Sequence, residues 1–122
     1  MRFLPTRVHG IVDYVWGALL LGLPFWLALP EGSAARPTAW IFGAGAIAYS
    51  LVTVYEVGLV PIVPMRLHLL LDVLAGAVLA ASPWLFGFAG TSTVPFVIFG
   101  LFSVVAGLVT RTDPTRTGRL AT

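Results

Sequence analysis

Long uncharged stretches dominate the chain, and short polar or turn-forming segments separate them. Charged side chains are absent from residues 14–30, 37–55 and 73–110. The third stretch is about twice as long as one membrane-crossing helix, and turn signals at Ser82-Pro83 and at 90–95 divide it. The pattern therefore predicts four transmembrane helices, at about residues 6–29, 38–58, 65–88 and 94–111.

The apolar runs are continuous and lack the alternation of period two that the strands of a membrane β-barrel show. Composition supports a helical membrane protein, because 58% of the residues are hydrophobic and only 10% are charged, against about 25% charged residues in soluble domains. The first predicted helix also resembles a secretory signal, with Arg2 and Arg7 before its apolar part. Its near-copy at 64–88 cannot be a signal, so both segments are expected to span the membrane. The expected fold class is an all-α membrane protein.

One polar motif occurs twice in the chain. Residues 5–17 return 59 positions later, with proline, arginine, histidine, aspartate and glycine at the same spacing. A fainter repeat with a shift of 57 relates the second predicted helix to the fourth, since Leu51-Val52-Thr53 matches Leu108-Val109-Thr110. We therefore expect one membrane domain made of two tandem helical hairpins. The domain covers residues 1–122, and its halves are 1–60 and 61–122.

The distribution of arginine predicts the orientation of the hairpins, because cytoplasmic loops are enriched in lysine and arginine. The chain has no lysine, and the first loop has only Arg36. The other arginines fall in the N-terminal segment, the second loop and the C-terminal segment: Arg2, Arg7, Arg66, Arg111, Arg116 and Arg119. We therefore expect a multi-pass protein of the cytoplasmic membrane with both termini in the cytoplasm. Both hairpins then enter the bilayer in the same direction, as a parallel repeat.

The charge and the cysteine count limit the kinds of partner and chemistry. The net charge of +2 comes without a basic cluster interleaved with aromatic residues, so the lipid bilayer, and not nucleic acid, is the expected partner. Thirteen glycines favour close helix packing within the bundle or in a homo-oligomer. The absence of cysteine excludes disulfides, thiolate metal sites and thiol catalysis.

The duplicated motif contains both histidines of the chain. A spacing of four residues places His9 beside Asp13, and His68 beside Asp72, on one face of each helix. Starting from Pro5, Asp13 lies about 12 Å along the helix axis, below the lipid headgroups. A carboxylate at that depth costs about 2.5 to 3.5 kcal/mol on insertion scales, so it needs a partner, a proton or a cation.

Three readings of the two histidine-aspartate pairs are open. His9, Asp13, His68 and Asp72 together offer the two nitrogen and two oxygen ligands that suit a divalent cation such as zinc, in a protein for cation or proton binding or transport. Alternatively, each aspartate accepts a hydrogen bond from its own histidine and pairs with Arg7 or Arg66, so that the repeats only lock the helices of a structural membrane component. A haem with two histidine ligands, or a quinone, is a third reading, although the aspartates would crowd a porphyrin.

Other polar residues offer less direct chemistry. Glu56, at the predicted cytoplasmic end of the second helix, could complete a cation site or pair with Arg7 or Arg66. Tyr49 is expected to form a hydrogen bond between helices. No nucleophile elbow and no phosphate-binding loop occurs, so an enzymatic function is disfavoured.

The third predicted helix contains Ser82-Pro83-Trp84 near its end, and the first contains a weaker copy, Leu23-Pro24-Phe25-Trp26. Together with the duplicated Arg-x-His-x-x-x-Asp, these segments resemble the SPW-repeat family of small bacterial and archaeal membrane proteins. The resemblance implies a small integral membrane protein and carries no assigned reaction. From the residues themselves, Ser82 is expected to cap the segment that Pro83 begins, and Trp84 and Phe88 to lie in the outer aromatic belt.

Overall fold

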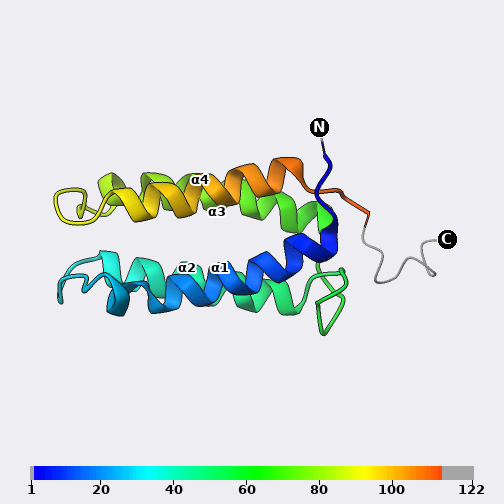
Figure 1. Ribbon diagram of the computed structural model, residues 1–122, viewed down its shortest axis with the longest axis horizontal. Coiled ribbons are helices and arrows are strands. Elements are labelled where there is room, and N and C mark those ends of the chain that lie inside the picture. The colour runs from blue at the N-terminus through cyan, green and yellow to red at the C-terminus, as the bar shows by residue number, and fades with distance from the viewer. Residues whose placement is uncertain (1, 114–122) are drawn as a thin grey trace.

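Two helical hairpins lie side by side in the computed structural model of the protein, which describes residues 2–113 (Figure 1). The described part is helical, as expected, and contains α1 (Thr6–Trp26), α2 (Ala35–Leu51), α3 (Met65–Leu85) and α4 (Val94–Val109). Loops 27–34 and 86–93 lie at one end of the bundle. Residues 2–5, loop 52–64 and residues 110–113 lie at the other end (Figure 1). Arg116 and Arg119, which contribute to the charge bias, lie outside the described residues.

Glycines bring the two helices of each hairpin into backbone contact. A Cβ atom added to Gly43 of α2 would lie 2.8 Å from the carbonyl oxygen of Gly17 in α1. A Cβ atom added to Gly76 of α3 would lie 2.6 Å from the carbonyl oxygen of Gly100 in α4. Both contacts are too short for a side-chain carbon, so the repeated glycines set the distance between the helices.

A substitution in α2 tests this packing. Gly43→Ala is expected to lower the free energy of unfolding by about 1 to 3 kcal/mol, because the added methyl group meets the backbone of α1 and the helices must separate. Gly45→Ala, two residues away, is the matched control, since a Cβ atom there has no neighbour within 4 Å. It is expected to be neutral or to stabilise by up to about 1 kcal/mol. Denaturation in detergent measures both, and equal effects would contradict helix contact at Gly43.

The second helix ends seven residues earlier than predicted, at Leu51 and not at residue 58. The next residues leave the helix and form backbone hydrogen bonds with residues near the end of the loop: the N–H of Val54 donates to the carbonyl oxygen of Val63 at 2.8 Å, and that of Val63 to Val52 at 2.7 Å. A run of two valines and a threonine favours this extended conformation, because β-branched side chains are restricted in a helix. Consequently residues 52–64 form a folded loop that turns Tyr55 inward.

The Ser82-Pro83-Trp84 segment continues α3, which ends at Leu85, so the expectation that Ser82 caps a new segment is wrong. Pro83 lacks an N–H and leaves the carbonyl oxygen of Leu79 without its usual helical donor. The hydroxyl of Ser82 donates to this oxygen at 2.6 Å instead. Trp84 is exposed, as the expected aromatic belt requires, whereas Phe88 is buried. The serine and the proline thus form a local unit that keeps the helix intact.

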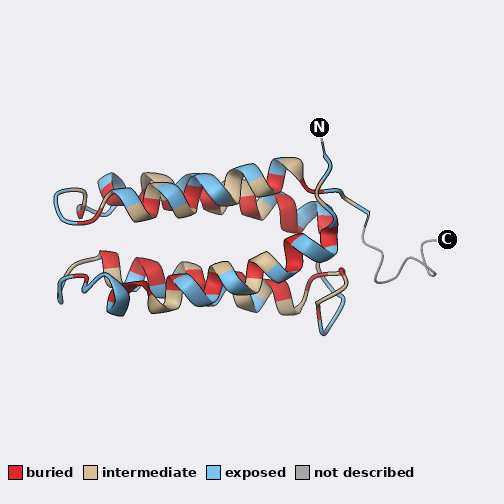
Figure 2. Ribbon diagram, in the orientation of Figure 1, coloured by how far each residue is buried: buried red, intermediate tan, exposed pale blue. Residues whose placement is uncertain are grey.

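Buried side chains lie mainly on the faces that the helices turn toward one another (Figure 2). The larger apolar core lies toward loops 27–34 and 86–93 and includes Leu20, Leu79 and Phe96, all fully buried. A smaller apolar cluster at the other end contains Tyr55, Met65 and Leu69. The polar residues of the repeated motif lie on α1 and α3 toward that second end.

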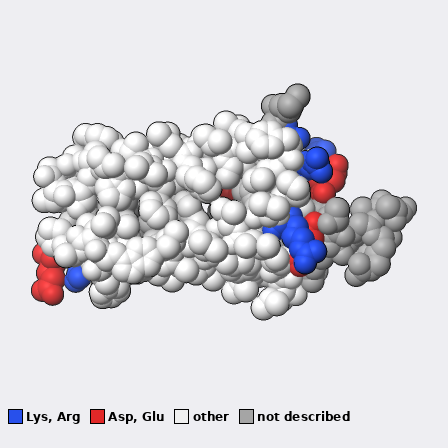
Figure 3. Space-filling view, viewed as in Figure 1, with Lys and Arg blue, Asp and Glu red and all other residues white. Residues whose placement is uncertain are grey.

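Two helices, α1 and α3, are long and apolar enough to cross a membrane, with 21 residues each. The partner helices α2 and α4 have 17 and 16 residues, so they extend about 25 Å each. Charged side chains on the visible face gather at the two ends of the molecule, and the surface between them is almost free of charge (Figure 3). The length of α1 and α3 and this uncharged belt are consistent with a protein that lies in a bilayer.

Candidate functional site

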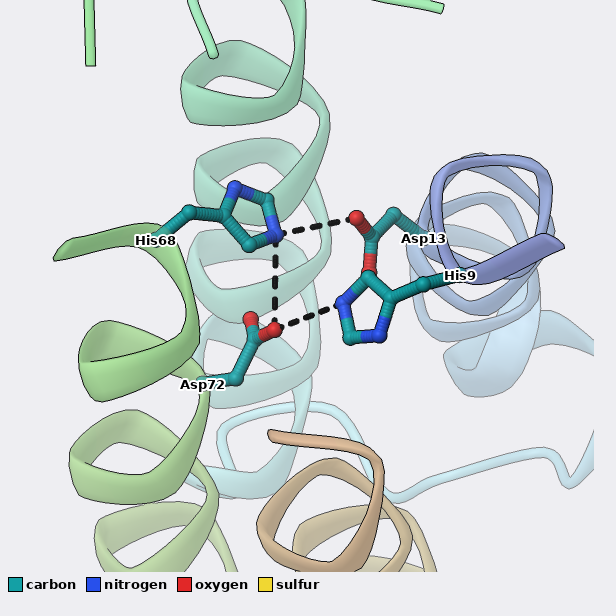
Figure 4. Close-up of side chains that lie close together, drawn as sticks. All are labelled: His9, Asp13, His68 and Asp72. Carbon is teal, nitrogen blue, oxygen red and sulfur yellow. Dashed lines mark hydrogen bonds and ion pairs between the residues drawn. The ribbon is translucent and has the colours of Figure 1, made fainter. Parts of the chain in front are cut away.

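The histidines and aspartates of the repeated motif converge between the two hairpins (Figure 4). His9 and Asp13 lie one turn apart on α1, and His68 and Asp72 lie one turn apart on α3. We call these four residues the His/Asp cluster. One nitrogen or oxygen atom from each residue lies within 4.8 Å of those of the others. Asp13 is 9% exposed and the other three are more deeply buried.

Contacts in the His/Asp cluster cross between the two halves of the chain. His9 Nε2 lies 2.8 Å from Asp72 Oδ2 and 3.0 Å from Asp13 Oδ1. His68 Nε2 lies 2.9 Å from Asp13 Oδ2 and 3.3 Å from Asp72 Oδ2. Each histidine therefore contacts the aspartate of the other half as closely as its own. The structure brings together the four residues that the sequence proposed as one site.

Arg7 and Arg66, proposed as partners of the carboxylates, are exposed. Among the described residues, the ion pairs of Asp13 and Asp72 come from the two histidines. The reason is helix geometry, since a residue two positions before a histidine lies about 200° around the helix axis from it. The arginines therefore lie at the end of the bundle and away from the cluster.

Two threonines fix the orientation of the imidazole rings. His9 Nδ1 lies 2.6 Å from Thr110 Oγ1, and His68 Nδ1 lies 2.7 Å from Thr53 Oγ1. Each threonine hydroxyl also donates to the backbone carbonyl four residues earlier, at 2.6 Å in both cases. A hydroxyl has a single proton, so each threonine must accept its second bond from an imidazole Nδ1–H. Both Nε2 atoms are consequently directed at the carboxylates.

This arrangement leaves the centre of the cluster in need of positive charge. With the proton on Nδ1, a neutral imidazole turns the lone pair of Nε2 toward carboxylate oxygens about 3 Å away, which is repulsive unless a proton or a cation lies between them. His68 Nε2 is fully buried, and its approach to Asp13 is too oblique for a hydrogen bond. The described residues therefore give this nitrogen no hydrogen-bond partner of good geometry.

Two tyrosines donate to the outer side of the carboxylates. The hydroxyl of Tyr49 in α2 donates to Asp72 Oδ1, which confirms the expected hydrogen bond between helices. The hydroxyl of Tyr55, in loop 52–64, donates to Asp13 Oδ2 at 2.8 Å. Burial and the nearby Asp13 carboxylate raise the pKa of Tyr55, so its hydroxyl keeps the proton that it donates. Each aspartate thus has one tyrosine that fixes its orientation.

Glu56 lies next to Tyr55 but belongs to a different set of contacts. Both of its carboxylate oxygens accept from the hydroxyl of Thr6, each at 2.8 Å. This bond joins loop 52–64 to the first turn of α1. The structure groups Glu56 with Thr6 and leaves it out of the set of four ligand atoms.

The space around the cluster is small. A cavity of about 10 Å³ adjoins His9, Asp13 and Asp72, which is room for about one water molecule. The rings of His9 and His68 have centroids only 5.4 Å apart, and the two carboxylates lie beside both Nε2 atoms. A porphyrin does not fit between these histidines, so the geometry disfavours the haem reading.

Sequence reasoning missed the threonines and the role of Tyr55. Thr53 and Thr110 stand at matching positions of the faint repeat with a shift of 57, and that repeat was the available signal. Each binds the histidine of the other half, so the pairing has the two-fold pseudo-symmetry of the chain. Tyr55 could not be placed from sequence because it enters the site only through the fold of loop 52–64.

Comparison with known proteins identifies the family of the chain. The SPW repeat domain matches residues 7–110, which include the His/Asp cluster and both threonines. No curated protein and no solved structure is significantly similar to the chain. Because the match covers most of the chain and includes the Ser82-Pro83-Trp84 segment, the chain belongs to the SPW-repeat family.

Proposed function

We propose that the chain is a four-span protein of the cytoplasmic membrane that binds a divalent cation, such as zinc, in the His/Asp cluster. Such a site would serve the binding or transport of the cation. The observation that carries the proposal is the convergence of two imidazole nitrogens and two carboxylate oxygens within 4.8 Å, with both imidazoles oriented by threonine. Imidazoles that bind a metal commonly donate their second N–H to a fixed acceptor in this way.

The nitrogen-oxygen distances in the cluster are close to those between the ligands of a zinc site. In a tetrahedral site with bonds of about 2.0 to 2.1 Å, neighbouring ligand atoms lie about 3.3 Å apart. The four nitrogen-oxygen contacts of the cluster range from 2.8 to 3.3 Å. These nitrogen-oxygen spacings are close to those of a zinc site. The two contacts of Asp13 use different oxygens, and the four ligand atoms lie within 4.8 Å of one another, so the side chains would turn and close on the ion as it binds.

Charge balance also favours a divalent ion. Two carboxylates and two neutral imidazoles carry a net charge of −2, which one divalent cation cancels. Two protons, one on each Nε2, would cancel it equally. A buried cluster in an apolar environment favours a neutral state, so cation binding is expected to displace protons and to weaken as the pH falls.

Calorimetric titration of chelator-treated protein in detergent tests the proposal. The wild type is expected to bind one Zn²⁺ per chain, and the double variant His9→Gln, His68→Gln is expected to bind none, because an amide is a poor substitute for an imidazole ligand. Thermal unfolding in chelator provides the folding control. The cluster has only a structural role if the wild type binds no zinc and if the double variant has a lower Tm that added zinc does not change.

The proposed topology has an independent test in a chain without cysteine. Arginine bias places loops 27–34 and 86–93 outside and loop 52–64 in the cytoplasm. A membrane-impermeant thiol reagent applied to intact cells is expected to label Glu31→Cys and to leave Leu59→Cys unlabelled. Both positions are well exposed, at 91% for the Glu31 side chain and 73% for Leu59. The reverse labelling pattern would show that the protein has the opposite orientation in the membrane.

A further inference from the structure

The two-fold pseudo-symmetry of the bundle is broken beside the His/Asp cluster. Tyr49 of α2 fills the space next to Asp72 and donates to it. The matching position on α4, with a shift of 57, is Ala106. The small cavity beside His9, Asp13 and Asp72 has Ala106 in its wall. Ala106 thus leaves this side of the cluster without the second tyrosine that the pseudo-symmetry would place there.

An apolar groove of about 220 Å³ adjoins this cavity on the side of α1 and α4. Its walls are entirely apolar and consist of Val12, Val15, Trp16, Leu19, Ile98, Phe99 and Phe102. The groove and the polar cavity share Val12, Trp16 and Phe102 as lining residues, so they lie side by side. The close backbone contacts between the hairpins run through α2 and α3, which leaves α1 and α4 further apart.

An acidic side chain is visible from this side of the molecule (Figure 3). In Figure 3, with α1 and α4 nearer the viewer, a small patch of acidic side chain lies between the two hairpins on an otherwise uncharged surface. Trp16 crosses the groove, where its indole N–H donates to the carbonyl oxygen of Phe99 at 3.1 Å. The groove therefore lies beside the cavity that Asp13 and Asp72 line, with Trp16 and Phe102 between the two.

We propose that the groove and the cavity together bind a membrane-soluble molecule with one hydroxyl head, of the phenol or long-chain alcohol class. The cavity has room for about one polar atom, and the groove accepts the apolar body. A hydroxyl can donate to a carboxylate oxygen of the cluster, as the hydroxyl of Tyr49, which also lines the cavity, does to Asp72. A carboxylate or phosphate head is excluded, because Asp13 and Asp72 would repel it at this depth.

Photochemical crosslinking locates such a ligand. An alkylphenol with a diazirine on its tail is expected to label α1 and α4 at groove residues such as Val15 and Phe102. An excess of 4-hexylphenol should compete with this label about tenfold better than its methyl ether, 4-hexylanisole, which lacks the donor proton. The experiment is run in chelator, so it does not depend on a bound cation.

Filling the cavity provides the second arm of the test. Ala106→Tyr places a phenol at the position that matches Tyr49, and it is expected to reduce the labelling at least tenfold. Val105→Tyr is the matched control, since it adds the same side chain at an exposed position of α4 and should leave the labelling unchanged.

Two results would overturn the proposal. Equal competition by the phenol and its methyl ether would show that the groove recognises only apolar bulk. Labelling spread equally over exposed residues of α2 and α3, such as Ile41 and Leu74, would show ordinary contact with lipid. If Ala106→Tyr does not fold, the comparison of phenol and ether on the wild type decides the question. Neither result bears on zinc binding.

Discussion

Replacing Asp13 by asparagine is expected to weaken Zn²⁺ binding by at least about 100-fold, and Asp72→Asn is expected to do the same. Either change removes one charged ligand and leaves the His/Asp cluster with a net charge of −1. A bound divalent cation then gives the buried site a net charge of +1 and no longer a neutral one. Removing one member of a buried charged set costs about 3 to 5 kcal/mol, and 1.4 kcal/mol is a factor of ten in affinity. Glu31→Gln is the matched control, because this carboxylate is 91% exposed.

The stability of the same variants shows whether the two aspartates share one site. Because His9 and His68 each contact both carboxylates, the effects of Asp13→Asn and Asp72→Asn on unfolding should be non-additive. A coupling of about 0.5 to 3 kcal/mol is expected for groups in one network, and added zinc should increase it. Additive effects that zinc does not change would indicate two independent structural ion pairs.

Replacing either threonine by valine is expected to lower zinc affinity about 10- to 100-fold, the usual cost of removing a partner that orients a histidine ligand. Valine keeps the shape of Thr53 or Thr110 but cannot accept the proton on the imidazole Nδ1. The two-fold pseudo-symmetry predicts effects of similar size, because each threonine binds one histidine at 2.6 to 2.7 Å. Calorimetric titration with Zn²⁺ measures both.

Thr38→Val is the matched control for the threonine variants. Its buried hydroxyl donates to the carbonyl oxygen of Ala34, four residues earlier, at 2.7 Å, as those of Thr53 and Thr110 do to theirs. It lies on α2 and contributes no bond to the His/Asp cluster. Zinc affinity should therefore be unchanged in Thr38→Val. An equal loss in all three variants would show a general effect on helix packing and would remove the threonines from the site.

The helices and the central cluster could be predicted because they rest on local periodicity and on the duplication. A four-residue spacing places His9 beside Asp13 in any helix, and the exact repeat at His68 and Asp72 implies a related environment. Gly17 and Gly76 lie four residues after Asp13 and Asp72, on the same helix faces. These are properties of a helix surface, and the sequence pattern contains them.

The remaining parts depend on contacts between distant segments. Thr110 meets His9 although 101 positions separate them, and only pairing of the two halves produces that contact. The end of α2 was predicted too late, because the hydrophobic run continues through Val52 and Val54 into the loop. Local apolar character does not reveal that the backbones of Val52 and Val54 form hydrogen bonds with that of Val63. Arg7 and Arg66 are close to the histidines in the sequence, which suggested ion pairs with the aspartates. A two-residue offset rotates them about 200° around the helix axis, so they lie away from the carboxylates.

X-ray absorption at the zinc edge, on protein loaded to one equivalent, tests directly whether the His/Asp cluster holds the ion. We expect a single shell of four nitrogen and oxygen ligands at about 2.0 to 2.1 Å with the scattering of two imidazoles. In Asp13→Asn the shell should lose an oxygen from the protein and gain a water molecule. A six-coordinate shell of water and carboxylate oxygens without imidazole in the wild type would contradict a shared cation site in the His/Asp cluster.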